Sequence, residues 1–479
     1  MRVLEDLEPK RVFYYFEELS KIPHGSQNTK KISDRIVEFA KEHDLKYIQD
    51  ESNNVIIIKE ASKGYENADA VILQGHIDMV CEKDADCKKD MENEGLDLAI
   101  NGDFIYAKGT TLGGDNGIAV AMMMAVLESD ELKHPKIEAV FTVDEEIGML
   151  GADKIDLSML SGRKLINMDS EDEGVFTVSC AGGNLTKTKI PVKRTDFDGK
   201  TFSIKVSGLK GGHSGIEIDK GRANANILMG RVLYEISQKC ELRIISVNGG
   251  VKDNVITFES ESIVCVSSEE GFLSLQQSFS DEYRSTDPDI RVDVCEAEYS
   301  MPLDFESSKN VIRMLTLIPN GVIEMSADIK GLVQTSLNLG IVKTTETEFI
   351  TGSCVRSSKE SQKKMLSQRI AILSETLGGT TEILGDYAGW DYLEDSDLRK
   401  LMIEVFLEQY GYEPKIEAIH AGLECGVLAA KIPGLDCISI GPNLLEIHTP
   451  RERMSVSSVE RVWKMIKEVL KKVIGSSFV

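Results

Sequence analysis

The sequence predicts an α/β catalytic domain interrupted by an inserted α+β domain, and three observations support this fold class. Helical and strand-like patterns alternate through the first third of the chain, a more β-rich texture fills the middle, and the first texture then returns. The expected boundaries are 1–185 and 389–479 for the two parts of the catalytic domain, and 186–388 for the insertion. A chain of 479 residues also exceeds the size of one hydrophobic core, so at least two domains are expected.

The first part of the catalytic domain begins with two segments that carry apolar residues at helical spacing, 9–22 and 30–43. The runs that follow are predicted as buried strands at NVIIIK, AVILQGHIDMV, IEAVFTVDEE and KLINMDSED, with a buried helix at GIAVAMMMAVLE. Strands alternating with helices favour a mixed, largely parallel sheet flanked by helices. Ligands bind such sheets outside the carboxyl ends of the strands, so residues at those ends are the first candidates for function.

The insertion and the last part of the chain differ in texture. Alternating patterns in the insertion predict strands such as KTFSIKVSG, ESIVCVSS and LVQTSLNLGIVK, in two blocks around helices, 200–295 and 320–385. After Trp390 helices and strands alternate again, and a final helix is expected from Val456 to Ile474.

Composition limits the functions open to this chain. A formal charge of −24 argues against a nucleic-acid partner, because such binding depends on basic patches. No run approaches the roughly 20 apolar residues that span a bilayer, and the charged N-terminus lacks a signal-like apolar core. We therefore expect no membrane partner and a cytoplasmic location. The nine cysteines are scattered without a CxxC pair, which fits reduced thiols.

The first candidate motif is HIDMV, where His76 and Asp78 follow an apolar run. Residues two apart on a strand point to the same face, and an imidazole beside a carboxylate suits a divalent metal. Asp78 could bind the ion itself or orient His76 from behind. Taken alone, the motif is explained better by a structural histidine paired with an acid, by about two to one.

The second motif, TTLGGDNG, surrounds Asp115 with glycines at the start of a predicted helix. Glycines there allow unusual dihedrals and the close approach of another group. A glycine-rich helix start with Asp115 as its N-cap is an equally good explanation of this motif alone.

The third motif, FTVDEEIG, ends a buried strand with Asp144, Glu145 and Glu146. Crowded carboxylates raise one another's pKa and need a proton or a cation to be tolerated. Adjacent side chains diverge, so one can transfer protons while the next binds metal. A charged surface turn is the alternative, but a buried strand seldom ends in three acids, so a functional role is favoured.

Two further motifs complete the set: NMDSED, where Asp169 ends another strand, and SIGPNLLEIHTPRERMS, where His448 precedes the last helix. Each motif is a weak signal alone. Together, five strand-end acids and histidines in one α/β domain predict a shared metal site.

With these motifs in place, the sequence resembles the aminoacyl-histidine dipeptidases, also called cytosol non-specific dipeptidases, a branch of the two-metal peptidases related to carnosinase and aminoacylase. The resemblance covers nearly the whole chain, from IPHGSQNTK to HTPRERMS, through LQGHIDMV, TTLGGDNGIA, FTVDEEIGMLGA, LINMDSEDEG, GLKGGHSG, NLGIV, IHAGLECG and SIGP. It implies a homodimeric hydrolase that cleaves dipeptides, both Xaa-His and broader Xaa-Xaa. It also implies two divalent metal ions, with zinc expected first and manganese or cobalt as alternatives.

The resemblance further implies how the metal ligands divide. Asp115 would bridge the two ions, with His76 and Asp169 completing one site and Glu146 and His448 completing the other.

Two more catalytic roles follow from the same resemblance. Asp78 would orient His76, and Glu145 would be the general base that takes a proton from a metal-activated water.

By the same resemblance, the insertion would be a lid that carries the dimer contact. His213, in GLKGGHSG, would reach the substrate carbonyl oxygen, often in the partner subunit's site, and Asn254 and Arg356 would bind the peptide carboxylate. The sequence departs from the family at two points. NVITF lacks the proline that usually ends the run containing Asn254, and IPHGS replaces the more common IPRPS.

Several alternatives stay open at this point. An aminoacylase-like or tripeptidase-like hydrolase would use the same metal centre on another amide. A catalytically inactive metal-binding or peptide-binding protein is disfavoured, because all five ligand positions are present together with Asp78 and Glu145. His420 and Glu424, in IHAGLECG, are equally expected to line the site or to pack beneath it.

Overall fold

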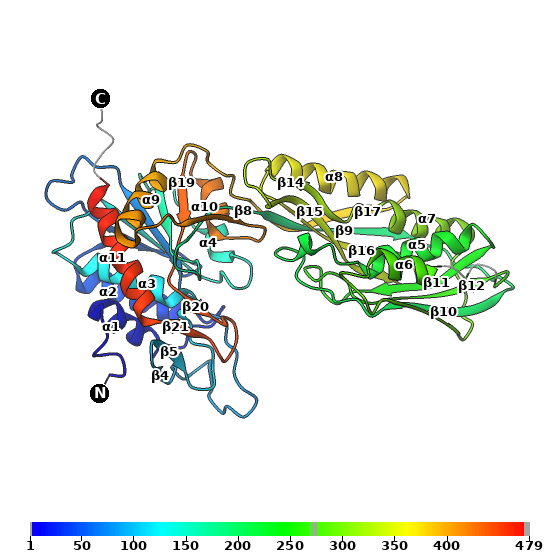
Figure 1. The fold of residues 1–479 in the computed structure, drawn as a ribbon, viewed down its shortest axis with the longest axis horizontal. Helices are drawn as coiled ribbons and strands as arrows, with labels where there is room; N and C mark the ends of the chain where they lie inside the picture. The colour runs from blue at the N-terminus through cyan, green and yellow to red at the C-terminus, as the bar shows by residue number, and fades with distance from the viewer. Residues whose placement is uncertain (1, 270–271, 273–274, 474–479) are drawn as a thin grey trace. The chain divides into compact units, whose positions relative to one another are not determined.

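The computed structural model describes residues 2–269, 272 and 275–473, which form two compact units (Figure 1). The first unit comprises Met1–Ser179, Trp390–Ala418 and Leu423–Val479, and the second comprises Cys180–Gly389 and Ile419–Gly422. The chain therefore enters the second unit twice. The sequence patterns suggested boundaries at 186 and 389 and gave no sign of the short return at 419–422.

The first unit is built from alternating helices and strands in the order expected from the sequence. Its elements are α1 (Lys10–Leu19), α2 (Lys30–Glu42), β1 (Lys46–Gln49), β2 (Val55–Lys59), β3 (Val71–His76), β4 (Leu98–Asn101), β5 (Phe104–Ala107), α3 (Gly114–Glu128), β6 (Ile137–Thr142), α4 (Leu150–Lys154), β7 (Lys164–Asn167), β8 (Val175–Cys180), α9 (Asp397–Tyr410), β18 (Lys415–Ile419), α10 (Glu424–Lys431), β19 (Asp436–Ser439), β20 (Leu444–Leu445), β21 (Arg453–Ser455) and α11 (Val456–Lys472). The predicted helix end at Ile474 lies outside the described residues.

The main sheet of this unit has a parallel centre. Its strand order is β1-β2-β6-β3-β7-β19-β8-β18, and β3 runs parallel to both β6 and β7. All residues of β3 and β6 are buried, as expected of strands covered on both faces. His76 is aligned with Thr142, so the chain leaves both strands at the same edge of the sheet. This confirms the predicted α/β class and places the strand-end motifs together.

Helices with different burial patterns surround this sheet. The helix α3 is buried on nearly all sides, which explains its run of alanine, valine and methionine residues. By contrast, α1, α2 and α11 bury one face and leave charged residues on the other. A smaller sheet, with strand order β20-β21-β5-β4, joins the C-terminal segment to the hairpin of residues 98–107.

The second unit is an antiparallel sheet covered by helices, which confirms the predicted α+β insertion. Its elements are β9 (Gly182–Pro191), β10 (Lys200–Ser207), the 3-10 helix Ile218–Lys220, α5 (Ala225–Ser237), β11 (Leu242–Gly249), β12 (Ser260–Val266), α6 (Leu275–Glu282), β13 (Arg291–Glu296), α7 (Phe305–Leu317), β14 (Gly321–Met325), β15 (Val333–Thr344), β16 (Glu348–Ser357), α8 (Glu360–Thr376) and β17 (Thr380–Tyr387). The strand order is β13-β10-β12-β11-β15-β16-β9-β17, with β14 paired to β15. The helices α5, α7 and α8 pack on it over a continuous apolar core.

Two features bear on the sequence-based expectations. Within the part of the chain that the structure describes, no helix is both long and apolar enough to cross a bilayer. All nine cysteines lie among the described residues, and no disulfide joins them.

Candidate metal centre

His76 lies at the end of β3 with only 1% of its surface exposed. Its Nδ1 donates a hydrogen bond of 3.0 Å to the main-chain oxygen of Asp78. Because a carbonyl can only accept, Nδ1 carries a proton, and Nε2 is the ring nitrogen that could bind a metal ion. This Nε2 lies 3.1 Å from Oδ1 of Asp115 and 3.3 Å from Oδ1 of Asp169.

Asp78 forms hydrogen bonds with other residues in addition to lying beside His76. Its carboxylate accepts hydrogen bonds from the hydroxyl of Ser26 at 2.8 Å and from the N–H groups of Glu145 and Glu146 at 3.1 and 3.4 Å. Burial opposes the charge of Asp78, but the hydrogen bonds from His76, Ser26 and the Glu145 N–H prevail and lower its pKa. Asp78 is therefore an anion, and it binds the N–H groups of the turn that follows β6.

The carboxylate of Asp115 contacts two histidines. Two residues before it, Gly113 has a φ of 66°, a left-handed conformation that favours glycine. The backbone dihedrals of Asp115 itself are not helical. Its Oδ1 faces Nε2 of His76 at 3.1 Å, and its Oδ2 faces Nε2 of His448 at 3.2 Å. The two oxygens of one carboxylate therefore face two different imidazoles.

His448 approaches from the loop between β20 and β21. Its Nε2 also lies 3.0 Å from Oε1 of Glu146. Hydrogen bonds with Asp115 and Glu146 raise the pKa of His448 to about 10, so without a metal this imidazole is a cation at neutral pH.

The remaining acids crowd the same edge of the sheet. Burial raises the pKa of Asp169 to about 6, with a further contribution from the charges of Asp115 and Glu146. Burial also raises the pKa of Glu145 well above its ordinary value, and the carboxylates of Asp169, Glu424 and Glu146 act in the same direction. So many anions in one buried place require compensating cations.

The donor set suits a divalent metal ion. His76, Asp115 and Glu146 each offer one ligand atom, and these atoms lie within 4.8 Å of one another. Imidazole nitrogen and carboxylate oxygen are ligands that zinc, manganese and cobalt all accept. The five predicted ligands thus lie together, while the function of each as a ligand stays a prediction.

A fully buried polar network lies behind three of the strand ends. Glu424, at the start of α10, accepts hydrogen bonds from the Gln74 amide and the Thr142 hydroxyl, and Asn167 donates to Gln74 at 2.6 Å. Thr142 and Asn167 are the last residues of β6 and β7, and Gln74 lies in β3 two residues before His76. Of the two alternatives for Glu424, the structure favours packing beneath the site, because the residue has no exposed surface.

The predicted substrate residues lie in the second unit. Nδ1 of His213 accepts hydrogen bonds from the N–H groups of Gly215 and Ile216 at 3.2 and 3.3 Å. The proton of the neutral ring therefore belongs to Nε2, which becomes a hydrogen-bond donor. Burial and the nearby charge of Arg356 lower the pKa of His213, so the ring is neutral at physiological pH.

Asn254 and Arg356 lie in different elements of that unit. The main-chain oxygen of Asn254 accepts a hydrogen bond of 2.9 Å from the N–H of Ser214, so its loop adjoins that of His213. Arg356 lies within β16, is 7% exposed, and donates to the hydroxyl of Tyr387 at 3.0 Å.

His420 belongs to the segment that returns to the second unit. Its Nε2 lies 2.7 Å from the Ser336 hydroxyl, and burial, followed by the charge of Arg356, lowers its pKa to about 3. His420 is therefore neutral and lies near the predicted carboxylate-binding arginine.

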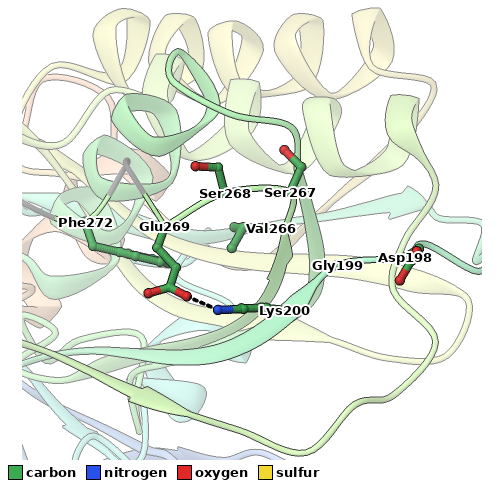
Figure 2. A pocket seen from close by; sticks show the side chains of 8 residues that line it. All are labelled: Asp198, Gly199, Lys200, Val266, Ser267, Ser268, Glu269 and Phe272. Atoms are coloured by element: carbon green, nitrogen blue, oxygen red, sulfur yellow. Dashed lines mark hydrogen bonds and ion pairs between the residues drawn. The ribbon is translucent and has the colours of Figure 1, made fainter.

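A separate open pocket of about 760 Å³ lies at one end of β10 and β12 in the second unit (Figure 2). Its lining residues are Asp198, Gly199, Lys200, Val266, Ser267, Ser268, Glu269 and Phe272. Lys200 forms an ion pair with Glu269, and none of the eight is a histidine or a cysteine. The pocket lining therefore offers neither an imidazole nor a thiol for metal binding or catalysis.

Comparison with known proteins agrees with this geometry. Residues 72–472 match the model of peptidase family M20/M25/M40. The cytosol non-specific dipeptidase of Escherichia coli (strain K12) is 34% identical over 487 residues, covering 99% of both chains. This chain belongs to peptidase family M20/M25/M40. The family is metal-dependent, and the cluster around Asp115 is the candidate site for such a metal.

Solved structures place the chain within the M20 family more closely. The aminoacylhistidine dipeptidase of Vibrio alginolyticus superposes with a TM-score of 0.93, at 34% identity and 99% coverage of both chains. A tripeptidase from Staphylococcus aureus gives a TM-score of 0.57 at 16% identity, covering 98% of this chain and 99% of its own, a similarity of fold alone. The resemblance inferred from the motifs is thus confirmed.

Sequence reasoning missed the residues that support the centre. Ser26 contacts Asp78 across 52 residues, and Gln74 contacts Glu424 across 350. A single hydroxyl or amide has no spacing pattern of its own. The only available signal was a glutamine, an unusual residue in the middle of the apolar run AVILQGHIDMV.

Proposed function

We propose that this M20 peptidase is a dipeptidase that cleaves Xaa-His and other Xaa-Xaa dipeptides with two bound divalent metal ions. The observation that carries the proposal is the Asp115 carboxylate, whose two oxygens face His76 and His448 at 3.1 and 3.2 Å. A carboxylate placed in this way can be shared by two cations. The 34% identity to a dipeptidase over 99% of the chain supports the substrate class.

The ligands would divide around Asp115 as the family resemblance implies. His76 and Asp169 would hold one ion, and Glu146 and His448 would hold the other. We propose zinc as the ion, with manganese and cobalt as the alternatives to be tested. When bound, two such ions lower the pKa of a water and stabilise negative charge on the scissile carbonyl oxygen.

Glu145 would serve as the general base. Burial keeps its pKa well above that of an ordinary glutamate, so its carboxylate can accept a proton from the attacking water and return it to the leaving amine. Asp78 would support both partners: it lies beside His76 and accepts the N–H of Glu145. The orientation of the Glu145 side chain would thus depend on Asp78.

The second unit would supply substrate contacts. Nε2–H of His213 would donate to the carbonyl oxygen as it gains negative charge, and Asn254 and Arg356 would bind the peptide carboxylate. A substrate held at both ends would explain a preference for short peptides. We further propose a cytoplasmic homodimer that acts on free dipeptides, with no nucleic-acid or membrane partner.

The test is a substrate and metal panel on one purified sample. Metal-free protein, prepared with a chelator, should be inactive, and zinc, manganese or cobalt restored separately should recover hydrolysis. Xaa-His and other dipeptides should be cleaved faster than tripeptides and N-acetyl amino acids. Faster turnover of acetylated compounds or tripeptides would replace the dipeptidase assignment by the aminoacylase-like or tripeptidase-like one.

A further inference from the structure

Glu452 is a buried acid with no role in the proposed reaction. It lies in the turn after His448, just before β21, and only 2% of its surface is exposed. Its two carboxylate oxygens accept the four consecutive main-chain N–H groups of residues 112–115, at 2.7, 3.1, 2.8 and 3.4 Å in chain order. One side chain therefore binds the whole loop that ends at Asp115.

These four N–H groups need an external acceptor. The first N–H groups of any helix lack partners within the helix, and they carry partial positive charge that favours an anion. Here the backbone is left-handed at Gly113 and non-helical at Asp115, so the loop cannot satisfy the groups itself. The direction of the Asp115 carboxylate therefore depends on how this irregular loop is held.

Glu452 is itself fixed to the segment that carries His448. Its N–H donates to the main-chain oxygen of Thr449 at 3.0 Å, and the next residue, Arg453, enters β21 and pairs with Tyr106. Glu452 thus joins the turn of His448 to the loop of Asp115, across more than 330 residues of sequence.

A purely structural cap would not require this residue. Asparagine, serine or threonine caps helix starts without adding charge. Glu452 instead places a carboxylate in direct contact with the main chain of an already anionic cluster, which costs free energy unless cations are bound nearby. The arrangement is better explained by the geometry it maintains.

We propose that Glu452 is a positioning residue that holds Asp115 with one carboxylate oxygen toward His76 and the other toward His448. The inference rests on the proposed function only in requiring that this cluster binds divalent cations. It assigns to Glu452 a role in metal binding and none in contacting the peptide substrate.

The test compares Glu452→Gln and Glu452→Asp with a matched control. Glutamine turns an NH₂ group toward two N–H donors, and aspartate keeps the charge but is one methylene too short to reach all four. The control, Asp103→Asn, removes a carboxylate that accepts from Ser455 and Ser457 in the same C-terminal segment but does not touch residues 112–115.

The readouts are the affinity of metal-free protein for Co²⁺, measured by competition with a chromophoric chelator, the visible absorption of bound Co²⁺, and the Tm of the metal-free protein. Both Glu452 variants should bind at least one Co²⁺ about 10–100-fold more weakly and show an altered Co²⁺ spectrum. Asp103→Asn should lower Tm and leave the affinity and the spectrum unchanged.

Wild-type affinity and spectrum in a folded Glu452→Gln or Glu452→Asp protein would overturn the proposal, as would an equal loss of affinity in Asp103→Asn. Should Glu452→Gln fail to fold, Glu452→Asp, which keeps the charge, decides the matter alone. The measurement uses no peptide, so a protein that binds Co²⁺ but cleaves no dipeptide would refute the proposed function and leave this test intact.

Discussion

The two units gather their candidate residues in different ways. In the first unit, β6, β3 and β7 are parallel neighbours, so His76, Glu146 and Asp169 leave the sheet at one edge. In the second unit the sheet is antiparallel, and the candidates come from loops and from within a strand. His213 and Asn254 lie in adjoining loops, as the Ser214 N–H to Asn254 oxygen bond shows.

The electrostatic character of the two groups also differs. The first unit packs carboxylates so closely that burial raises the pKa of Asp169 to about 6, whereas the second presents a neutral His213 beside the cation Arg356. An anionic cluster suits cations, and a neutral donor with a guanidinium suits a carbonyl oxygen and a carboxylate. We infer that activation of water belongs to the first unit and recognition of the peptide to the second.

The largest expected effect tests the first unit. Glu145→Gln removes the proposed general base, so kcat should fall by about 10²–10⁴-fold. Metal content, measured by elemental analysis, should stay near that of the wild type, because Glu145 is not a proposed ligand. The neighbouring Asp144→Asn is the matched control and should keep its turnover. Normal activity in Glu145→Gln would remove Glu145 from the mechanism.

A smaller effect is expected for the second unit. His213→Ala removes the Nε2–H donor, so kcat should fall by about 10²–10³-fold while Co²⁺ or Zn²⁺ affinity is unchanged. Steady-state kinetics and metal titration on the same preparation separate the two readouts. Weakened metal binding in this variant would contradict the division of labour, and unchanged kinetics would exclude His213 from catalysis.

The smallest effect concerns pH. Hydrogen bonds with Asp115 and Glu146 raise the pKa of His448 to about 10 in the metal-free protein. They therefore stabilise the fold fully below about pH 6.5, the ordinary value, and this contribution disappears as pH rises toward 10. A metal must displace this proton, so apparent affinity should increase by up to about tenfold per pH unit over that range. Titrations at pH 6.5, 7.5 and 8.5 measure it, and a pH-independent affinity would show that His448 is neutral before metal binds.

The strand-end residues could be predicted because their positions follow from the architecture. Once apolar runs are identified as parallel strands, His76 and Asp169 must emerge at the same edge. His448 was singled out by its position between a strand-like run and the last helix, and the resemblance then supplied its expected role as a metal ligand. Asn254 and Arg356 likewise depend on the resemblance, since nothing in an antiparallel pattern indicates which loops will adjoin.

The supporting residues could not be predicted, because their roles arise only on folding. Glu452 binds a loop some 340 residues earlier, and its local sequence, RERMS, resembles an ordinary charged turn. The return of 419–422 to the second unit could not be predicted either, since it begins at the last residue of β18 and ends just before α10, both otherwise parts of the first unit. Polar contacts between residues far apart in the chain produce no periodic pattern in the sequence.

That four-residue return restricts how the protein can be divided by engineering. A fragment cut at Cys180 and Gly389 would omit Ile419 and Ala421, whose main-chain oxygens both accept a hydrogen bond from the N–H of Ala181. It would also leave the Ser336 hydroxyl without its partner His420. A chimaera that exchanges this module between relatives would therefore need two grafts, one long and one of four residues. The two units are interleaved in the chain, so the second unit cannot be cut out as one continuous segment.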